Sequence, residues 1–124
     1  MRKIEFRGKN FVGKWCYGYY LHDGQRGRHV ITDGLLDING VVPDTIGQFT
    51  GCYDKNGKPV YEGDILKYRG YDIRGIEKEC IEPVVYSEQC SFDPLTDELI
   101  WTKREFEVIG NIHDNPGLLK GGKE

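Results

Sequence analysis

The stretch at residues 47–68 decides the fold, and it reads GQFTGCYDKNGKPVYEGDILKY. Residues 49–53 are β-prone, the tetrapeptide Asp54-Lys55-Asn56-Gly57 tolerates positive φ angles, and residues 58–61 resume an extended pattern. A second turn at Glu62-Gly63-Asp64 leads into the next alternating segment. The density of charges and aromatic rings in this stretch therefore predicts a β-hairpin followed by another strand. The residues expected to form its turns are Asn56, Gly57, Gly63 and Asp64.

The composition of the whole chain favours strands over helices. Glycine accounts for 17 of the 124 residues, and alanine, the best helix former, is absent. Tyrosine, isoleucine and valine, which favour strands, are frequent. A chain of this length is expected to form one domain with a core of its own. Its net charge of −3 provides no general attraction to nucleic acid or to an anionic membrane.

Period-two alternation predicts further strands on both sides of the hairpin. Between residues 15 and 21 one side of the strand carries Trp15, Tyr17, Tyr19 and Leu21, and we expect this aromatic ladder to face the core. Gly18, on the other side, leaves room for a neighbour. We also expect a strand at residues 73–76 and at most one helical turn at residues 117–120.

The cysteines and the N-terminus argue against a metal site and against secretion. The four cysteines, at positions 16, 52, 80 and 90, form no CxxC pair, and the chain has only three histidines. The first residues lack the apolar run of a signal peptide, and no segment is apolar over the length of a bilayer. We therefore expect free thiols in a reducing cytoplasm, with no cofactor, no metal and no membrane partner.

Several spaced motifs carry a resemblance to a known family. They are Ile46-Gly-Gln-Phe-Thr-Gly, Asp54-Lys-Asn-Gly-Lys, Tyr61-Glu-Gly-Asp-Ile and Phe106-Glu-Val-Ile-Gly-Asn-Ile-His-Asp-Asn-Pro, preceded by Ile4-Glu-Phe-Arg-Gly-Lys and Trp15-Cys-Tyr-Gly-Tyr. In this order they resemble the YopX family of phage and prophage proteins. The resemblance covers nearly the whole chain and is weakest at residues 71–105.

The resemblance implies an architecture rather than a chemistry. It predicts a mainly β protein with little helix, forming a single domain over residues 1–124. Within it, N-terminal strands at residues 1–45 would precede a small SH3-like barrel at residues 46–113 and a tail at residues 114–124. It also implies a phage or prophage accessory protein in the cytoplasm of a bacterial host. The family supplies no catalytic residue to transfer, and the matched residues are glycines, turn formers and aromatic residues of the barrel.

Charge is distributed unevenly along the sequence. Residues 1–28 contain seven Lys or Arg and two acidic residues, a net charge of +5, whereas residues 77–107 contain three basic and nine acidic residues, a net charge of −6. Cations interleaved with aromatic residues could bind a nucleic-acid strand. We favour the alternative, in which the charges are the solvated faces of strands whose aromatic residues lie in the core. In this alternative the basic region pairs with the acidic segment of the same or another subunit. The candidate partner-binding residues are Lys3, Arg7, Lys9, Lys14, Tyr20, Arg26 and Arg28.

An enzyme is a less favoured alternative. Cys52 lies near Asp54, and His113 precedes Asp114, so a Cys/His/Asp arrangement can be imagined. A strand thiol is the simpler interpretation of Cys52, and Asp64 is better suited to accept backbone hydrogen bonds in its turn. We therefore expect a non-enzymatic protein that binds a host or phage macromolecule or associates with itself, with nucleic-acid binding as the alternative.

Overall fold

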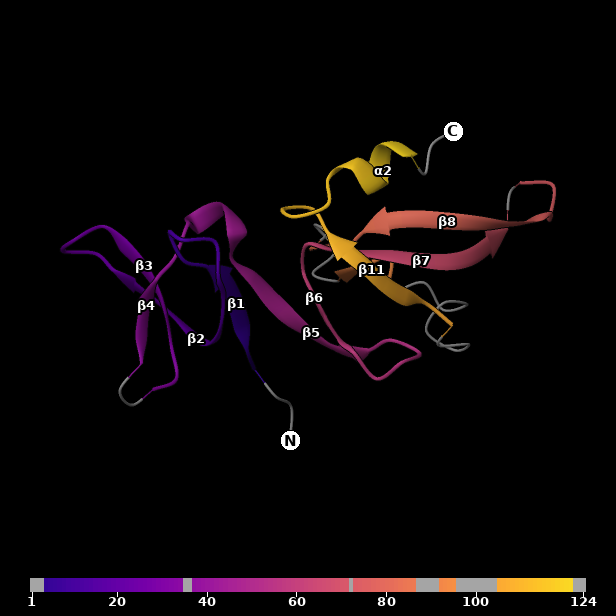
Figure 1. Ribbon diagram of the computed structural model, residues 1–124. Helices are drawn as coiled ribbons and strands as arrows, with labels where there is room; N and C mark the ends of the chain where they lie inside the picture. The colour runs from indigo at the N-terminus through magenta and orange to yellow at the C-terminus, as the bar shows by residue number, and fades with distance from the viewer. Residues whose placement is uncertain (1–3, 35–36, 72, 87–91, 96–104, 122–124) are drawn as a thin grey trace. The chain divides into compact units, whose positions relative to one another are not determined.

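The computed structural model describes residues 4–34, 37–71, 73–86, 92–95 and 105–121. The chain divides into two compact units, Met1–Gly51 and Cys52–Glu124, called here the first and second unit. In these described residues the secondary structure is mostly short strands, with the 3-10 helix η1 and the short α-helix α2. Figure 1 shows the labelled elements. The protein is therefore mainly β with little helix, as predicted.

The strands of the first unit follow one another as antiparallel neighbours in the order β4-β3-β2-β1-β5. Their bounds are β1 Phe6–Lys9, β2 Trp15–Asp23, β3 Arg28–Thr32, β4 Ile38–Gly40 and β5 Gly47–Tyr53, with the 3-10 helix η1 at Pro43–Thr45. Strand β5 continues beyond the boundary between the units and pairs with β6, Pro59–Tyr61. The hairpin predicted around Asn56 and Gly57 is thus present.

The second unit contains two further sheets. Strands β7 (Asp64–Tyr71), β8 (Glu77–Pro83) and β11 (Glu107–Asn111) form an antiparallel sheet in the order β11-β7-β8 (Figure 1). Strand β9 (Val85–Tyr86) pairs with β10 (Phe92–Asp93), and the helix α2 spans Gly117–Gly121, where one helical turn was predicted. None of the sheets in the described part of the chain closes into a barrel, so the predicted SH3-like barrel at residues 46–113 is not confirmed.

The hydrophobic core of the second unit is built from residues far apart in the sequence. Its buried members are Val60, Leu66, Val84, Leu95 and Phe106. Burial of apolar side chains of this size provides the main favourable free energy of folding. The predicted strand at residues 73–76 is wrong, because residues 73–75 form the turn between β7 and β8 and Gly75 has a φ of 80°.

The first unit corrects the predicted orientation of strand β2. Tyr17, Tyr19 and Leu21 were expected in the core, yet 52%, 57% and 57% of these side chains, respectively, are exposed. The inner side of the sheet instead carries Gly8 and Gly18, where the chain packs closely. A Cβ atom at Gly8 would lie 3.2 Å from Val41 Cβ, and one at Gly18 would lie 2.2 Å from the Thr32 carbonyl oxygen.

Gly18 therefore leaves room for a neighbour, as predicted, and it adopts a φ of 151°. Alternation reveals that a strand has two different sides, but it does not reveal which side is covered. Here the side opposite Tyr17 carries the buried Ile31 and the Phe6 and Tyr20 rings together with Gly8 and Gly18, so this side faces inward.

Candidate partner-binding face

Strand register places several large side chains on the same side of the first unit's sheet. Arg7 pairs with Tyr17 and Lys9 with Trp15 across β1 and β2. Tyr19 pairs with Thr32, and Thr32 in turn pairs with Ile38 on β4. Directly paired residues project from the same side of an antiparallel sheet. This side is called here the outer face. It comprises Arg7, Lys9, Trp15, Tyr17, Tyr19, Leu21, Val30, Thr32 and Ile38.

The exposed side chains of the outer face are aromatic and aliphatic, and they lie on β2 and β4, on either side of the buried Val30 and Thr32 of β3. Besides the three β2 side chains that are more than half exposed, Ile38 has 65% of its surface exposed. Single exposed apolar residues are common, but a contiguous group on one sheet face is typical of an interaction site.

One edge of the outer face carries cations packed on an indole ring. Arg7 Cζ lies 4.5 Å from the centroid of the Trp15 ring, and Lys9 Nζ lies 5.4 Å from it. Cation–π attraction at these distances holds both charges beside the ring. Arg7 is buried with 6% of its surface exposed, so the positive charge at this edge is fixed in place.

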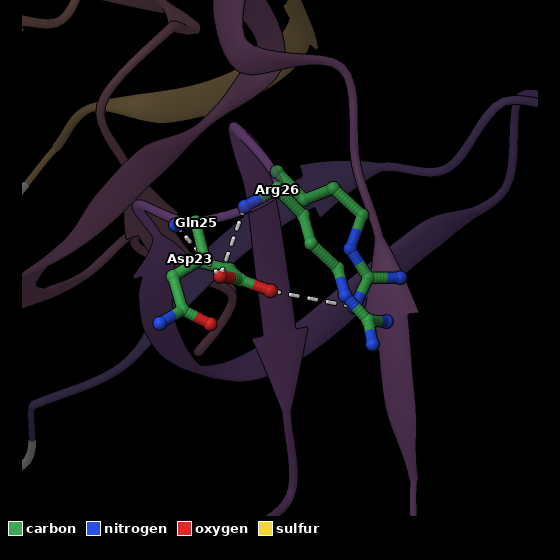
Figure 2. A network of polar contacts seen from close by, with 4 residues as sticks. Asp23, Gln25 and Arg26 are labelled. Atoms are coloured by element: carbon green, nitrogen blue, oxygen red, sulfur yellow. Dashed lines mark hydrogen bonds and ion pairs between the residues drawn. The ribbon is translucent and has the colours of Figure 1, made fainter.

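The turn between β2 and β3 follows the end of the outer face at Asp23. Figure 2 shows the polar contacts of Asp23 in this turn. Asp23 Oδ1 accepts hydrogen bonds from the backbone N–H groups of Gln25 and Arg26, at 3.1 and 3.3 Å. Arg28, which pairs with Asp23 across the sheet, also forms an ion pair of 3.6 Å with it. The aspartate thus orders this turn and holds Arg28 at the end of the face.

The structure brings together only part of the predicted candidate set. Arg7, Lys9 and Arg28 lie on one side of the sheet, and Arg26 lies in the bordering turn. Lys14 is exposed at the end of the β1–β2 turn, where its backbone N–H donates to Asn10 Oδ1 at 2.9 Å. Lys3 lies outside the described residues.

Tyr20 was placed in the candidate set, but it belongs to the opposite side of the sheet. Its hydroxyl lies 2.7 Å from His29 Nδ1, and its ring stacks on that imidazole with a centroid distance of 5.9 Å. The Phe6 ring lies 5.8 Å from it on the same side. The parity of β2 could have identified Tyr17 and Tyr19 as the alternative, since both alternate with Tyr20 in the sequence.

The aspartates of the hairpin and of the turn after it accept hydrogen bonds from backbone N–H groups. Asp54, which is buried, accepts backbone hydrogen bonds through Oδ1 from Asn56 and Lys58, both at 2.9 Å, and through Oδ2 from Val108 at 3.0 Å. Asp64 Oδ2 accepts the N–H of Tyr61 at 2.8 Å. Gly57 and Gly63 have φ angles of 81° and 94°, which suit glycine.

Asp54 belongs to the turn predicted from the sequence, and an aspartate two residues before Asn-Gly is a common turn signal. The carboxylate also reaches Val108, 54 positions away. That contact depends on the tertiary fold and has no local signature.

The candidate nucleophile and the acidic segment are also placed by the structure. Cys52 is half-buried and packs against the hydrophobic core of the second unit. Glu79 pairs with Lys67 at 3.1 Å and Glu77 with Arg69 at 3.7 Å across β7 and β8. Two acidic residues of the segment at 77–107 thus have basic partners within their own sheet.

Tyr68 and Glu82 form a polar contact on the β7–β8 sheet. The Tyr68 hydroxyl donates a hydrogen bond of 2.7 Å to Glu82 Oε2. Burial, reinforced by this hydrogen bond and the glutamate charge, raises the pKa of Tyr68 far above its ordinary value. The phenol therefore stays neutral in the folded protein.

The described residues also bear on metal binding and on membrane insertion. No group of three or more His, Cys, Asp or Glu that could hold a metal ion occurs among them. The helices found in the same part of the chain are too short or too polar to cross a membrane.

Comparison with known proteins identifies one family and one fold. The model of the family described as YopX protein matches residues 2–120, which confirms the resemblance seen in the sequence. No curated protein matches the chain. The crystal structure of protein EF1440 from Enterococcus faecalis is similar, with a TM-score of 0.61 and 23% sequence identity over 96% of this chain and 99% of that chain. At this identity the likeness shows a shared fold.

Proposed function

Because the chain belongs to the YopX family, we propose that it is a non-enzymatic phage or prophage accessory protein. It acts in the cytoplasm of the bacterial host by binding a macromolecular partner, or a second copy of itself, through the outer face. The phage origin and the compartment are what the family resemblance implies. The mode of action is argued from the side chains of the first unit.

The observation that carries this proposal is the exposure of the outer face. Tyr17, Tyr19, Leu21 and Ile38 each have more than half of their surface exposed, although neighbouring Val30 and Thr32 on the same sheet are buried. Removing apolar surface from water contributes about 25 cal/mol per Å², so a partner covering these side chains would gain substantial binding free energy. Tyrosine is also enriched among the residues that dominate protein interfaces.

The proposal that the protein is not an enzyme is supported by the roles of its reactive side chains. Asp54 and Asp64 accept backbone hydrogen bonds, and Cys52 packs against a hydrophobic core. Thiol labelling of the native protein tests this point. Fast reaction of Cys52 alone near neutral pH would indicate a lowered thiol pKa and would contradict the proposal.

The finer fold assignment also belongs to the proposal. We retain an SH3-like barrel at residues 46–113, supported by the succession of short antiparallel strands β5 to β8 and β11. An experimental structure that covers residues 96–104 tests whether the strands close.

Capture from a bacterial host lysate, with and without nuclease, tests the proposed function. We expect the wild-type chain to retain a partner, Leu21→Glu to lose it, and Val85→Glu to retain it. Val85 is a matched control, because it is an exposed aliphatic residue on a strand of the second unit. Absence of any captured partner and of self-association would overturn the proposal, as would equal capture by all three chains.

A further inference from the structure

The aromatic residues of the outer face lie on a single strand at regular spacing. Trp15, Tyr17 and Tyr19 alternate along β2. Residues two apart on a strand are separated by about 6.6–6.8 Å. Base stacking on aromatic rings requires unstacked bases and tolerates any base, since every base has a π face. The ladder therefore offers successive platforms to a strand whose bases are not paired.

Cations stand at both ends of this ladder. Arg7 and Lys9 lie beside Trp15 and Tyr17 on β1, and Arg28 lies across from the far end of β2. Asp23 shares this side with Arg28, and alternation along the chain places Glu5 on the same side as Arg7 and Lys9. The three cations and two carboxylates give these positions a net charge of +1. The face is therefore complementary to a polyanion, although the whole chain is acidic.

The shape of the face selects single strands over duplexes. Its side chains project from a sheet, and the structure places no helix among β1 to β4 that could enter a groove. Bases in a duplex are stacked on one another and do not offer their faces to tyrosine. Leu21, which follows Tyr19 on the same side of β2, supplies an apolar contact for sugars and base faces.

We infer that the outer face binds single-stranded nucleic acid, with bases stacked on Tyr17 and Tyr19 and phosphates beside Lys9 and Arg28. This inference rests on the proposed function and names its partner class. Trp15, held by the guanidinium of Arg7, extends the stacking platform at one end. DNA and RNA share the recognised chemistry, and the test below separates them.

Fluorescence anisotropy with labelled oligonucleotides tests the inference on the full chain. The probes are oligothymidine and oligouridine of about 12 nucleotides, long enough for one site, and a duplex of the same length. Titrations are run at about 50 mM and about 200 mM salt. We expect at least one single strand to bind more tightly than the duplex. Two phosphate contacts would give a slope of log K against log salt of about −1.4.

Paired variants locate the site. Tyr17→Ala and Tyr19→Ala should each weaken binding by about fivefold or more. Tyr71→Ala should have no effect, because Tyr71 is a comparably exposed tyrosine on a strand of the second unit. Lys9→Gln should reduce the salt slope by about 0.7, whereas Lys58→Gln should leave it unchanged. Circular dichroism of each variant verifies that it is folded.

Three results would overturn the inference. They are the absence of salt-sensitive binding to either single strand, equal affinity of the Tyr17→Ala and wild-type chains, and tighter binding of the duplex. If lysate capture still depended on Leu21 but yielded only protein, the inference would fail and the proposed function would stand. The same holds if light scattering showed a dimer that Leu21→Glu dissociates.

Discussion

The two units of the protein use their polar and aromatic residues in opposite ways. In the second unit, Asp54 and Asp64 bind backbone N–H groups, and Phe106 is buried in the core. In the first unit, Tyr17 and Tyr19 face solvent beside a fixed cationic edge. Side chains that complete the fold are needed for stability, whereas exposed ones contribute little to it. The comparison therefore separates a unit whose distinctive residues maintain the fold from one whose distinctive residues are available to a partner.

The charged side chains named below also have different neighbours in the two units. In the second unit, Glu77 and Glu79 are neutralised by basic residues on the neighbouring strand. In the first unit, Arg7 and Lys9 lie against the π face of Trp15. The π face attracts a cation without neutralising it. Arg28 of the first unit also forms an ion pair with Asp23, so the units differ in the packing of two cations on an aromatic ring and not in the presence of ion pairs.

The largest effect on stability is expected from the core of the second unit. Phe106 has 1% of its surface exposed and packs among Val60, Leu66 and Val84. Phe106→Ala should lower the free energy of unfolding by about 3–5 kcal/mol, because it removes buried apolar contacts and leaves a cavity. Urea denaturation followed by circular dichroism measures this loss. A change below about 1 kcal/mol would mean that this core does not govern stability.

Removal of the Asp54 carboxylate should cause the next largest loss in the free energy of unfolding. Asp54→Ala leaves the N–H groups of Asn56, Lys58 and Val108 without their acceptor, and a loss of about 2–4 kcal/mol is expected. Asp54→Asn retains one carbonyl acceptor and should lose less. Urea denaturation midpoints of the two variants measure the loss of stability. Equal midpoints would show that the lost hydrogen bonds do not cause it.

Gly18 offers a stability test within the first unit. A Cβ at Gly18 would meet the Thr32 carbonyl, whereas one at Gly13 would meet no atom within 4 Å, and both glycines have positive φ angles. Gly18→Ala should therefore lower stability by about 1–3 kcal/mol more than Gly13→Ala does. Thermal unfolding of the two variants compares them. Similar melting temperatures would argue against the close packing of β2 on β3.

A smaller, pH-dependent difference in the free energy of unfolding is expected between the wild type and Tyr68→Phe. Its pKa is raised in the folded protein, so its contribution to stability is complete below the pKa of the unfolded chain, near 10, and is lost as pH rises above it. Tyr68→Phe should cost about 0.5–1.5 kcal/mol at neutral pH, where the hydrogen bond to Glu82 is lost. Above pH 10 the variant should lose stability less steeply than the wild type.

Urea denaturation from about pH 7 to about pH 11 measures this difference. Titrations of the other tyrosines and of the lysines are common to both chains, so the difference isolates Tyr68. If stability fell equally with pH in the wild type and in Tyr68→Phe, the raised pKa of Tyr68 would be contradicted.

The smallest stability effect is expected on the outer face. The combined change Tyr17→Ala and Tyr19→Ala should alter the free energy of unfolding by about 0.5 kcal/mol or less, since both rings are more than half exposed. Differential scanning calorimetry measures the change. A large loss would show that these rings support the fold and would remove the contrast between the units.

Local chemistry explains which features could be predicted. Asn56 and Gly57 formed the predicted turn because hairpin signals depend on adjacent residues. Family membership followed from motifs spread along the chain. The orientation of Tyr17 and Tyr20 could not be predicted, because alternation along one strand is satisfied equally well by either side facing inward.

The sequence by itself determined a mainly β protein, the hairpin at residues 54–57 and membership of the YopX family, since these depend on composition, turn residues and motif order. Only the tertiary structure decided that Asp54 reaches Val108, that Tyr20 packs on His29, and that Tyr17 faces solvent beside Arg7. Those outcomes depend on strand register and on where glycine lets two backbones approach. Both are properties of segments distant in the sequence, so no local pattern encodes them.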